Sequence, residues 1–493
     1  MEKRVTSPAE LLAVIGVASV LVLVPLVPGR VQLGTIPLES LTFAVPLALL
    51  LCIPLLRQLG TRELPRVGFE LAVLAFLAIA LIGIPFSTAA KVSIGTWARY
   101  AGYILLVPAV AAVARKEANR RVLLWILVGA GAITAVIGVI QYLNPSTINA
   151  IGIQGLDESI ATRIYSTYVN PNFYSEYLVL LFGATLSLAF AEKGFLRGLA
   201  AGLLGLEAVA LLLTYSRGSW LALVAGVVVA VLMIDARYLL ALLGAGGLGA
   251  AVVPSIRHRV LSIFSLEGTA SFRLRLWRLA GTIIQRNPWL GVGMGQFVRA
   301  FKDVSLQHPE LGTGYLIYGA HNSYFTIMAE AGILGGLAFV WVVVSICRMG
   351  VFYGDRMDGD MSAKLQNAAL TVGLVAFAFN ALTSNSFQHP QAAVFFWVLA
   401  GLQTGLGARF WTKPVEERAP ISVPSKQTTG VFTGSAVLRW ARGAARFLQN
   451  AWNDSDVRRG LLAAPRGNGD VFRCSWLASI LFGKGRAAET ESA

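Results

Sequence analysis

Long apolar runs separated by short polar gaps are the feature that most constrains this chain. A helix needs about 20 mostly apolar residues to cross the roughly 30 Å hydrocarbon core of a bilayer. Runs that meet this requirement lie at residues 9–28, 38–56, 69–86, 95–114, 121–142, 172–191, 195–214, 218–235, 237–254, 322–346, 365–385 and 391–409. The sequence therefore predicts an all-α polytopic membrane protein with about 12 transmembrane helices and a long loop between helices 9 and 10.

The composition excludes other classes of protein. Charged residues make up only 14% of the chain, and hydrophobic residues make up 56%, whereas a soluble domain carries roughly 25% charged residues. The net charge of +15 is spread over short gaps rather than gathered in one block, which argues against a nucleic-acid-binding domain. Cys52, Cys347 and Cys474 lie too far apart to form a disulfide framework or a zinc motif.

The basic residues give the predicted orientation. They concentrate in alternate gaps, which the positive-inside rule assigns to the cytoplasm; these residues are Arg57, Arg62, Arg66, Arg115, Lys116, Arg120, Arg121, Lys193, Arg197, Arg237, Arg348 and Arg356. Both termini are then cytoplasmic. No small-residue cleavage site follows the basic start at Met1–Arg4, so the first apolar run is predicted to remain as a helix.

The domain organisation follows from this orientation. Residues 1–411 form the predicted transmembrane domain, and the loop 255–321 lies on the outer face although it is rich in arginine. Loops longer than roughly 60 residues largely escape the positive-inside rule. The tail at 412–493 is predicted to be cytoplasmic. Its segment 435–452 has the pattern of an amphipathic helix in the membrane interface, and a poorly ordered tail with one nascent helix is the alternative.

Two outer segments carry arginines that need an explanation. Arg217 lies in a very short turn between two apolar runs, either as a snorkelling anchor or as an anion site. A guanidinium is always charged and binds phosphate through two parallel hydrogen bonds. Further along, Arg273 and Arg275 belong to a predicted amphipathic helix whose apolar side would carry Leu274, Trp277, Gly281 and Ile284. The glycines after Pro288 are interpreted as turn residues, because no strand precedes them as in a nucleotide loop.

A histidine and an asparagine stand where the long outer loop enters the tenth apolar run. His321 and Asn322 either cap this helix or contribute a general base. Neutral imidazole has a pKa near 6.5 and can accept a proton from a hydroxyl near pH 7. Gly332, Gly335 and Gly336 would allow another helix to approach closely.

These motifs together resemble those of the O-antigen ligase family over roughly residues 1–410. His321 and Asn322, followed at fixed spacing by Gly332 and Gly336, resemble the signature of that family. The resemblance extends to Ser216-Arg217-Gly218, to Arg273 and Trp277 followed by Pro288, Gly291 and Gly293, and to Arg163, Tyr165, Ser166 and Thr167 followed by Asn170-Pro171-Asn172. The tail beyond residue 412 has no recognised counterpart.

The resemblance implies a membrane glycosyltransferase of the lipid-linked-sugar type in the bacterial inner membrane, active on the periplasmic face. Its donor would be a glycan linked to undecaprenyl pyrophosphate, and its acceptor would be a hydroxyl of lipid A-core. The family is regarded as metal-independent and needs no cofactor. The sequence agrees, because no paired acidic motif on the outer face would hold a divalent cation.

Under this interpretation the candidate residues have distinct roles. Arg217 and Arg273 would bind the pyrophosphate, with Arg275 as the alternative for the second position, and His321 would take the proton of the acceptor hydroxyl or orient it. Asn322 would fix the imidazole or the sugar. Tyr165, Asn170 and Asn172 would line the glycan path, or else cap the helix that follows them.

Other functions remain open. An O-antigen or exopolysaccharide polymerase, or a protein O-oligosaccharyltransferase, would use the same donor with another acceptor, and the uninterrupted His-Asn-to-Gly spacing favours the ligase. A secondary transporter is less favoured, because such folds place their sites near the bilayer midplane. Here the candidate residues gather at one face.

Overall fold

The computed structural model describes residues 7–27, 31–33, 36–38, 40–63, 68–144, 163–168, 170–235, 238–240, 269–309, 319–357 and 359–411. Its long helices are α1 Pro8–Leu26, α2 Ser40–Glu63, α3 Glu70–Gly83, α4 Ala90–Ala114, α5 Glu117–Leu143, α7 Pro171–Ala191, α8 Gly194–Leu213, α9 Arg217–Ile234, α12 Thr269–Arg286, α13 Phe297–Gln307, α14 Ser323–Arg356, α15 Met361–Asn380 and α16 Pro390–Gly407. A short 3₁₀ turn at Ile84–Phe86 follows α3. Two more flank α16, with Ser386–Gln388 before it and Ala408–Phe410 after it.

The fold confirms the prediction of an all-α polytopic membrane protein. Among the described residues, ten helices are long and apolar enough to cross a bilayer, and each coincides with a predicted run. The run at 69–86 forms a shorter apolar helix, Glu70–Phe86. The predicted span at 237–254 and the tail at 412–493, with its segment 435–452, lie outside the described residues apart from a helical stretch at 238–240.

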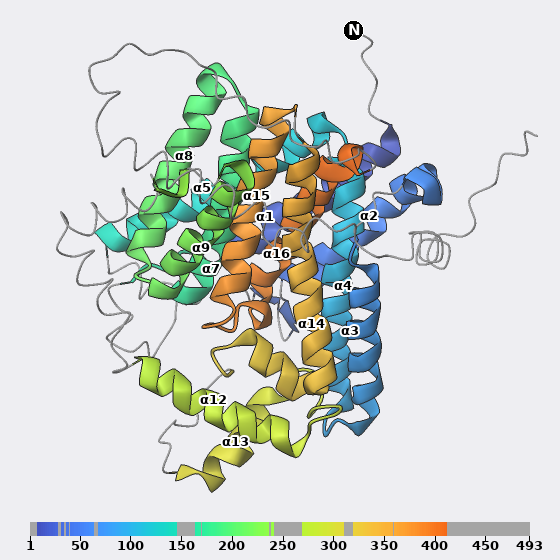
Figure 1. The fold of residues 1–493 in the computed structure, drawn as a ribbon, viewed down its shortest axis with the longest axis vertical. Coiled ribbons are helices and arrows are strands. Elements are labelled where there is room, and N and C mark those ends of the chain that lie inside the picture. The colour runs from blue at the N-terminus through green and yellow to red at the C-terminus, as the bar shows by residue number, and fades with distance from the viewer. Residues whose placement is uncertain are drawn as a thin grey trace, which may run out of the picture.

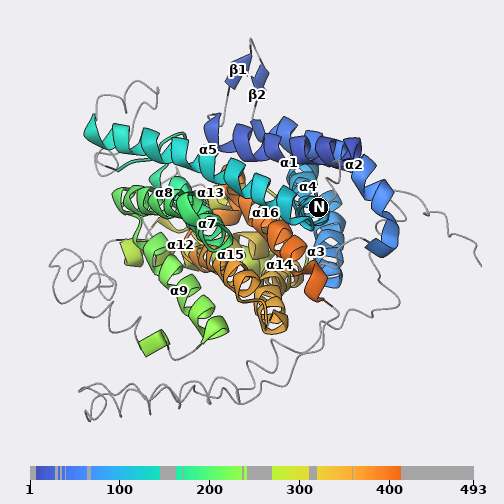
Figure 2. The same cartoon turned by 90° about the horizontal axis from the view of Figure 1, so that it is seen from above.

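A small hairpin departs from the purely helical prediction. Strand β1 (Val31–Leu33) pairs antiparallel with β2 (Ile36–Leu38), so that Val31 lies opposite Leu38. The hairpin occupies the short gap between α1 and α2 and projects from the side of the bundle (Figure 2). It lies away from the helices that carry the candidate residues.

The core of the bundle is built around α7, α15 and α16. Helix α16 is buried along almost its whole length, and Trp397 and Tyr177 are fully buried. Small residues allow the central helices to approach closely: a Cβ added to Gly183 of α7 would lie 2.7 Å from the backbone nitrogen of Gly373 in α15. Gly226 of α9 meets the Val372 carbonyl of α15 in the same way. Close backbone approach at small residues is the usual means by which membrane helices associate.

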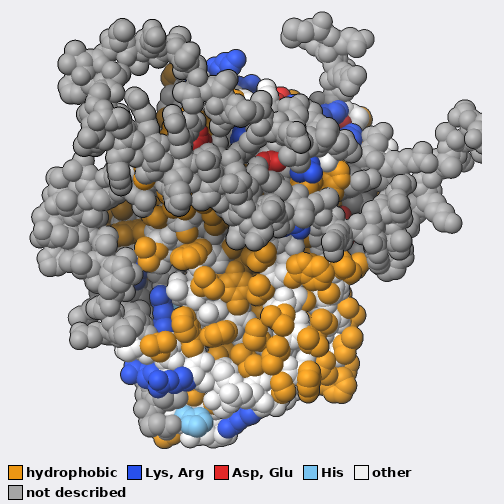
Figure 3. Space-filling view, viewed as in Figure 1, with side chains coloured by type: hydrophobic (Ala, Val, Ile, Leu, Met, Phe, Trp, Pro, Cys, Tyr) orange, Lys and Arg blue, Asp and Glu red, His pale blue; other side chains and the backbone are white. Residues whose placement is uncertain are grey.

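The two ends of the bundle differ in what covers them. Helices α12 and α13 lie across one end, at the bottom of Figure 1, and this end is called the α12 end. The opposite end, where α5 begins and α7 ends, is called the far end. On the face seen in Figure 3, hydrophobic side chains cover most of the lower surface, and Lys and Arg side chains gather at the corner that holds α12.

The boundaries of α14 differ from those predicted. This helix extends to Arg356, so Arg348 and Arg356, which were expected in a loop, are helical. The sequence between them remains apolar on one side, and Met349 and Phe352 are buried. Arg356 stays in the helix because its Nη1 donates to the Phe352 carbonyl (3.3 Å) and its guanidinium lies over the Phe352 ring. Long basic side chains at a helix end commonly turn back in this manner.

Candidate functional site

Three turns at the α12 end contain backbone strain. Among the described residues, Ser166, Tyr215 and His321 are the non-glycine residues with positive φ, at 53°, 51° and 49°. Such conformations cost about 1–3 kcal/mol each and persist only where the surroundings hold them. Each of the three lies beside a candidate residue, or is one, so the strain marks the same turns that the sequence motifs do.

The turn before α7 is held by side chains from neighbouring helices. Gln141 of α5 accepts from the backbone nitrogens of Tyr165 (3.2 Å) and Ser166 (2.7 Å) and donates to the Ser166 carbonyl (3.0 Å). Asn170 caps α7 by accepting from the Asn172 backbone nitrogen (2.8 Å). Arg163 donates to Asn172 Oδ1 and to the Thr214 carbonyl, both at 2.8 Å. Arg163 therefore links the turn before α7 to the turn between α8 and α9.

The turn between α8 and α9 places Arg217 at the first residue of α9. Behind it, Ser219 Oγ lies 2.7 Å from Ser175 Oγ of α7 and accepts from Asn380 Nδ2 of α15 at 3.2 Å. Gly218 has room for no larger side chain without pressing on Asn380 and Thr383. The end of α9 is thus tied to α7 and α15, which fixes the backbone that carries Arg217.

The glycine-rich loop after α12 joins this helix to a bend in α14. The backbone nitrogens of Val292 and Gly293 donate to the carbonyls of Ala329 and Glu330, both at 2.9 Å, and Ile333 donates to the Pro288 carbonyl at 2.8 Å. Gly332 has φ 75° at the bend, and a Cβ there would overlap the Trp289 carbonyl. Gly291, Gly293 and Gly295 also have positive φ, which confirms the interpretation of this stretch as turn glycines.

Helix α12 packs on the start of α14 through a face that differs slightly from the predicted one. Its buried residues are Leu276, Leu279, Ala280 and Ile283, whereas Leu274 is exposed. Trp277 makes an edge-to-face contact with Phe325 of α14. The helix is rotated relative to the prediction because its partners are the short segments beside it, α13 and the start of α14, rather than the lipid alone.

Arg273 and Arg217 lie near each other. Burial lowers the pKa of the Arg273 guanidinium, and the positive charge of Arg217 lowers it further. No carboxylate in the described part of the chain pairs with Arg273. Two cations near each other favour the approach of an anion, which is the role predicted for them from the sequence. Arg275, the alternative candidate, instead turns toward the Phe272 ring, with its guanidinium carbon 5.8 Å from the ring centroid.

His321 and Asn322 form the start of α14. Asn322 Oδ1 accepts from the backbone nitrogens of Tyr324 (3.0 Å) and Phe325 (3.1 Å), so it caps the helix. The backbone of Ser323 is anchored to the loop after α15, because its nitrogen donates to the carbonyls of Ala381 (2.8 Å) and Ser384 (3.0 Å). His321 itself is half-buried.

Glu176 and His389 form an acid–histidine pair that sequence reasoning missed. Glu176 lies in the second turn of α7 and His389 lies directly before α16, and His389 Nδ1 is 2.8 Å from Glu176 Oε2. The other carboxylate oxygen accepts a short hydrogen bond from Ser384 Oγ. A carboxylate inside an apolar run was the available signal, since ionisable residues within membrane helices commonly have a function.

The imidazole of His321 responds to this surrounding charge. Burial lowers its pKa to about 4, and the charges of Arg273 and His389 contribute in the same direction, partly offset by Glu176. The side chain is therefore neutral near pH 7. Because the charges of His389, Glu176 and Arg273 act on His321, these residues lie near it at the α12 end.

The predicted residues thus fall into two groups. Arg217, Arg273 and His321 come from three separate elements at the α12 end, where Arg273 lies near both Arg217 and His321. Asn170, Asn172 and Asn322 use their side-chain oxygens within the local turns, and Tyr165 is almost fully buried, which raises its pKa. The predicted roles of Tyr165, Asn170 and Asn172 in lining a glycan path, and of Asn322 in fixing the imidazole or the sugar, stay predictions. Among the described residues, no group of three or more His, Cys, Asp or Glu is placed to hold a metal ion.

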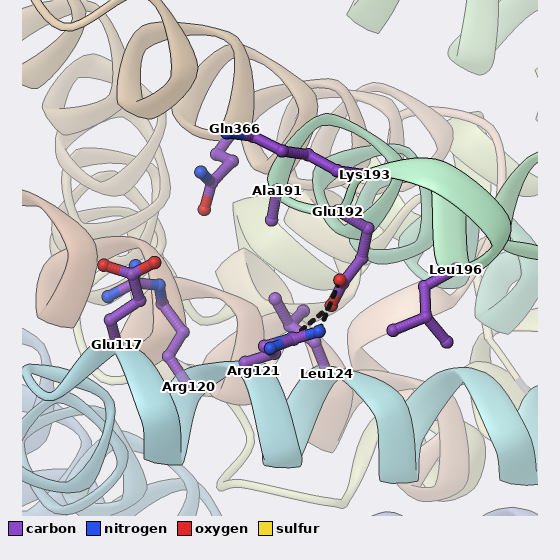
Figure 4. A pocket seen from close by; sticks show the side chains of 9 residues that line it. All are labelled: Glu117, Arg120, Arg121, Leu124, Ala191, Glu192, Lys193, Leu196 and Gln366. Atoms are coloured by element: carbon purple, nitrogen blue, oxygen red, sulfur yellow. Dashed lines mark hydrogen bonds and ion pairs between the residues drawn. The ribbon is translucent and has the colours of Figure 1, made fainter. Parts of the chain in front are cut away.

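A pocket of about 240 Å³ lies at the far end of the bundle (Figure 4). Arg121 and Glu192 form an ion pair in its lining, with Nη2 2.6 Å from Oε2, and Trp125 Nε1 donates to the same carboxylate at 2.9 Å. Arg120 Nη1 donates to the Ala114 carbonyl at 3.2 Å. The pocket is lined by both acids and bases, and it contains none of the candidate residues.

The fold and the site define a multi-pass membrane protein with a cationic, histidine-containing centre at one end. Residues 200–340 match the family model described as O-antigen ligase. The match agrees with the resemblance inferred from the motifs and confirms it for this segment. The matched segment includes Arg217, Arg273 and His321. No curated protein matches the chain.

Proposed function

We propose that this protein is an O-antigen ligase-like glycosyltransferase that moves a glycan from undecaprenyl pyrophosphate to a hydroxyl of lipid A-core. The family match supports a membrane glycosyltransferase of the ligase or polymerase type. One observation carries the donor assignment: at one end of a membrane bundle, Arg217 lies near Arg273, and Arg273 lies near His321. This end faces the periplasm in the proposal, with both termini in the cytoplasm.

Fixed positive charge suits the chemistry of the donor. The acceptor oxygen forms a bond to the anomeric carbon while the bond from that carbon to the pyrophosphate oxygen breaks, and the electron pair stays on the pyrophosphate. Arg217 and Arg273 stabilise the charge that develops on this leaving group. The polyprenyl tail of the donor remains in the bilayer beside the apolar helix surfaces. In the proposal these guanidinium groups replace a divalent cation, so transfer continues in the presence of EDTA.

His321 provides contact with the acceptor. Its imidazole is neutral near pH 7 because burial and neighbouring cations lower its pKa to about 4. In this state one ring nitrogen accepts and the other donates a hydrogen bond. The imidazole therefore takes the proton of the acceptor hydroxyl or orients that hydroxyl toward the anomeric carbon. Asn322 acts mainly through the backbone, since its oxygen caps α14.

A polymerase is the second candidate, because it uses the same donor and the family match covers both types. Purified full-length protein in proteoliposomes, supplied with a lipid-linked glycan and three acceptors, separates the alternatives. Glycan on lipid A-core identifies a ligase, longer lipid-linked chains identify a polymerase, and modified protein identifies a protein O-oligosaccharyltransferase. Solute flux without any glycan transfer would contradict the enzyme assignment and indicate a transporter.

A further inference from the structure

Glu176 and His389 form a largely buried acid–histidine pair at the α12 end. Glu176 is fully buried, His389 is 11% exposed, and Nδ1 lies 2.8 Å from the carboxylate. When a carboxylate binds Nδ1–H, the ring is held in one tautomer and Nε2 keeps its lone pair. His389 is therefore prepared to act as a general base.

Neighbouring side chains fix the orientation of the His389 ring. The Phe173 ring lies against it, with 3.3 Å between the two centroids. The histidine precedes Pro390 at the start of α16 without capping this helix through its side chain. The imidazole is thus positioned by contacts with residues of α7, and it is not needed to cap the start of α16.

The pair is physically connected to the start of α14. Ser384, which donates to Glu176, also accepts through its carbonyl from the Ser323 nitrogen (3.0 Å) and from Ser323 Oγ (3.2 Å). The Phe387 nitrogen donates to Ser323 Oγ at 3.1 Å. One loop, residues 381–389, therefore holds both His389 and the segment that carries His321.

The charges around the two histidines favour different roles for them. The charged groups that act on His321 are Arg273 on α12, Glu176 on α7 and His389, and Arg217 of α9 acts in turn on Arg273. His321 lies on the cationic side, where a protonated imidazole is disfavoured. His389 contacts the buried carboxylate directly. Since Glu176 binds Nδ1, Nε2 of His389 is the nitrogen that can accept a proton released in the site.

We propose that His389, oriented by Glu176, accepts the proton of the acceptor hydroxyl, while neutral His321 orients that hydroxyl. This inference rests on the glycosyl transfer proposed above. As the acceptor oxygen bonds to the anomeric carbon, its proton moves to Nε2 of His389, and the pyrophosphate leaves with the electron pair of the broken bond. The imidazolium then returns the proton to water. Glu176 is a positioning residue, because it acts through His389.

The test measures transfer kinetics of the full chain in proteoliposomes with lipid-linked glycan and the active acceptor. His389→Ala lowers kcat by about 10²–10⁴-fold with little change in KM, and added imidazole restores part of the rate. Glu176→Gln lowers kcat less, and Glu176→Asp recovers part of that loss. The acid side of the pH–rate profile, which reports protonation of the base, disappears in His389→Ala.

Ser384→Ala tests whether the pair is only a structural tether. It removes the hydrogen bond to the other oxygen of Glu176 but leaves the imidazole in place, so it lowers kcat less than His389→Ala does. The inference is overturned if His389→Ala keeps near-normal kcat. It is also overturned if Ser384→Ala loses as much rate as His389→Ala and imidazole rescues neither, since the pair would then be a structural tether. Absence of transfer by wild type to every acceptor would instead remove the proposed function itself, and this inference with it.

Discussion

The two ends of the bundle differ in how their basic side chains are paired with carboxylates. At the far end, ion pairs neutralise three of the basic side chains: Lys116 with Glu10, Arg121 with Glu192, and Arg409 with Asp360. At the α12 end, the described residues contain one acid–base pair, His389 with Glu176, and Arg273 has no carboxylate partner. Neutralised charge anchors helices in the membrane, whereas uncompensated positive charge is available to an anionic ligand.

The backbone shows the same contrast. Gly194 at the far end has φ 55°, and a side chain there would meet no atom within 4 Å. Gly332 at the α12 end has φ 75° and is enclosed by the loop that follows α12. The turn at Gly194 therefore leaves room for a side chain, while the bend at Gly332 is enclosed by the turn that follows α12.

The largest expected effect comes from the site arginines. Arg217→Ala and Arg273→Ala each lower the transfer rate by about 10²–10³-fold, because each removes a positive charge from the leaving group. Arg121→Ala at the far end is the matched control and keeps near-normal activity. Rates measured in proteoliposomes at equal protein amounts check this. Equal losses for all three variants would show that the two ends do not differ in function.

The next effect concerns stability. Gly332→Ala lowers the free energy of unfolding by more than about 2 kcal/mol, because a left-handed backbone disfavours a Cβ and the added atom overlaps the Trp289 carbonyl. Gly194→Ala lowers the free energy of unfolding by only about 1–2 kcal/mol, which is the cost of a Cβ on a left-handed backbone. Melting temperatures in detergent, read by intrinsic fluorescence, compare the two. A smaller loss for Gly332→Ala than for Gly194→Ala would contradict the close joint between α12 and α14.

A smaller effect is expected from pH. The folded protein keeps His321 neutral down to about pH 4, whereas an unfolded histidine takes up a proton near pH 6.5. The unfolded state therefore binds more protons in this window, and stability falls as the pH drops from about 6.5 to about 4. His321→Gln lacks this contribution, so its melting temperature declines less than that of wild type over the same range. Parallel decline of both proteins would show that His321 is not buried beside cations.

The smallest effect is expected at the far-end ion pair. Burial raises the pKa of Glu192, but hydrogen bonds from Arg121 and Trp125 outweigh this and leave the pKa below its ordinary value. At pH values above the ordinary pKa of a glutamate, the pair stabilises the folded protein. This stabilisation is lost as the pH falls through the lowered pKa of Glu192. Glu192→Gln therefore lowers the melting temperature slightly near pH 7, less so in acid, with unchanged transfer. A large loss of transfer would place a function in the pocket of Figure 4.

The sequence predicted most of the fold because hydropathy is a local property. The ten long spans coincide with apolar runs, and the motif residues Arg217, Arg273 and His321 were expected on one face for the same reason. Contacts between distant segments were not predictable in this way. Glu176 and His389 are 213 positions apart and approach only when α7 packs on α16. The bend at Gly332 likewise depends on the loop near Trp289, which no local pattern reveals.

The central claim is that paired guanidinium groups at the α12 end hold a diphosphate. Binding of undecaprenyl pyrophosphate to the full chain in nanodiscs, measured by calorimetry, tests it most directly. We predict that wild type and Arg121→Ala bind with equal affinity and that Arg217→Ala and Arg273→Ala bind far more weakly. Unchanged affinity in both site variants would contradict the account.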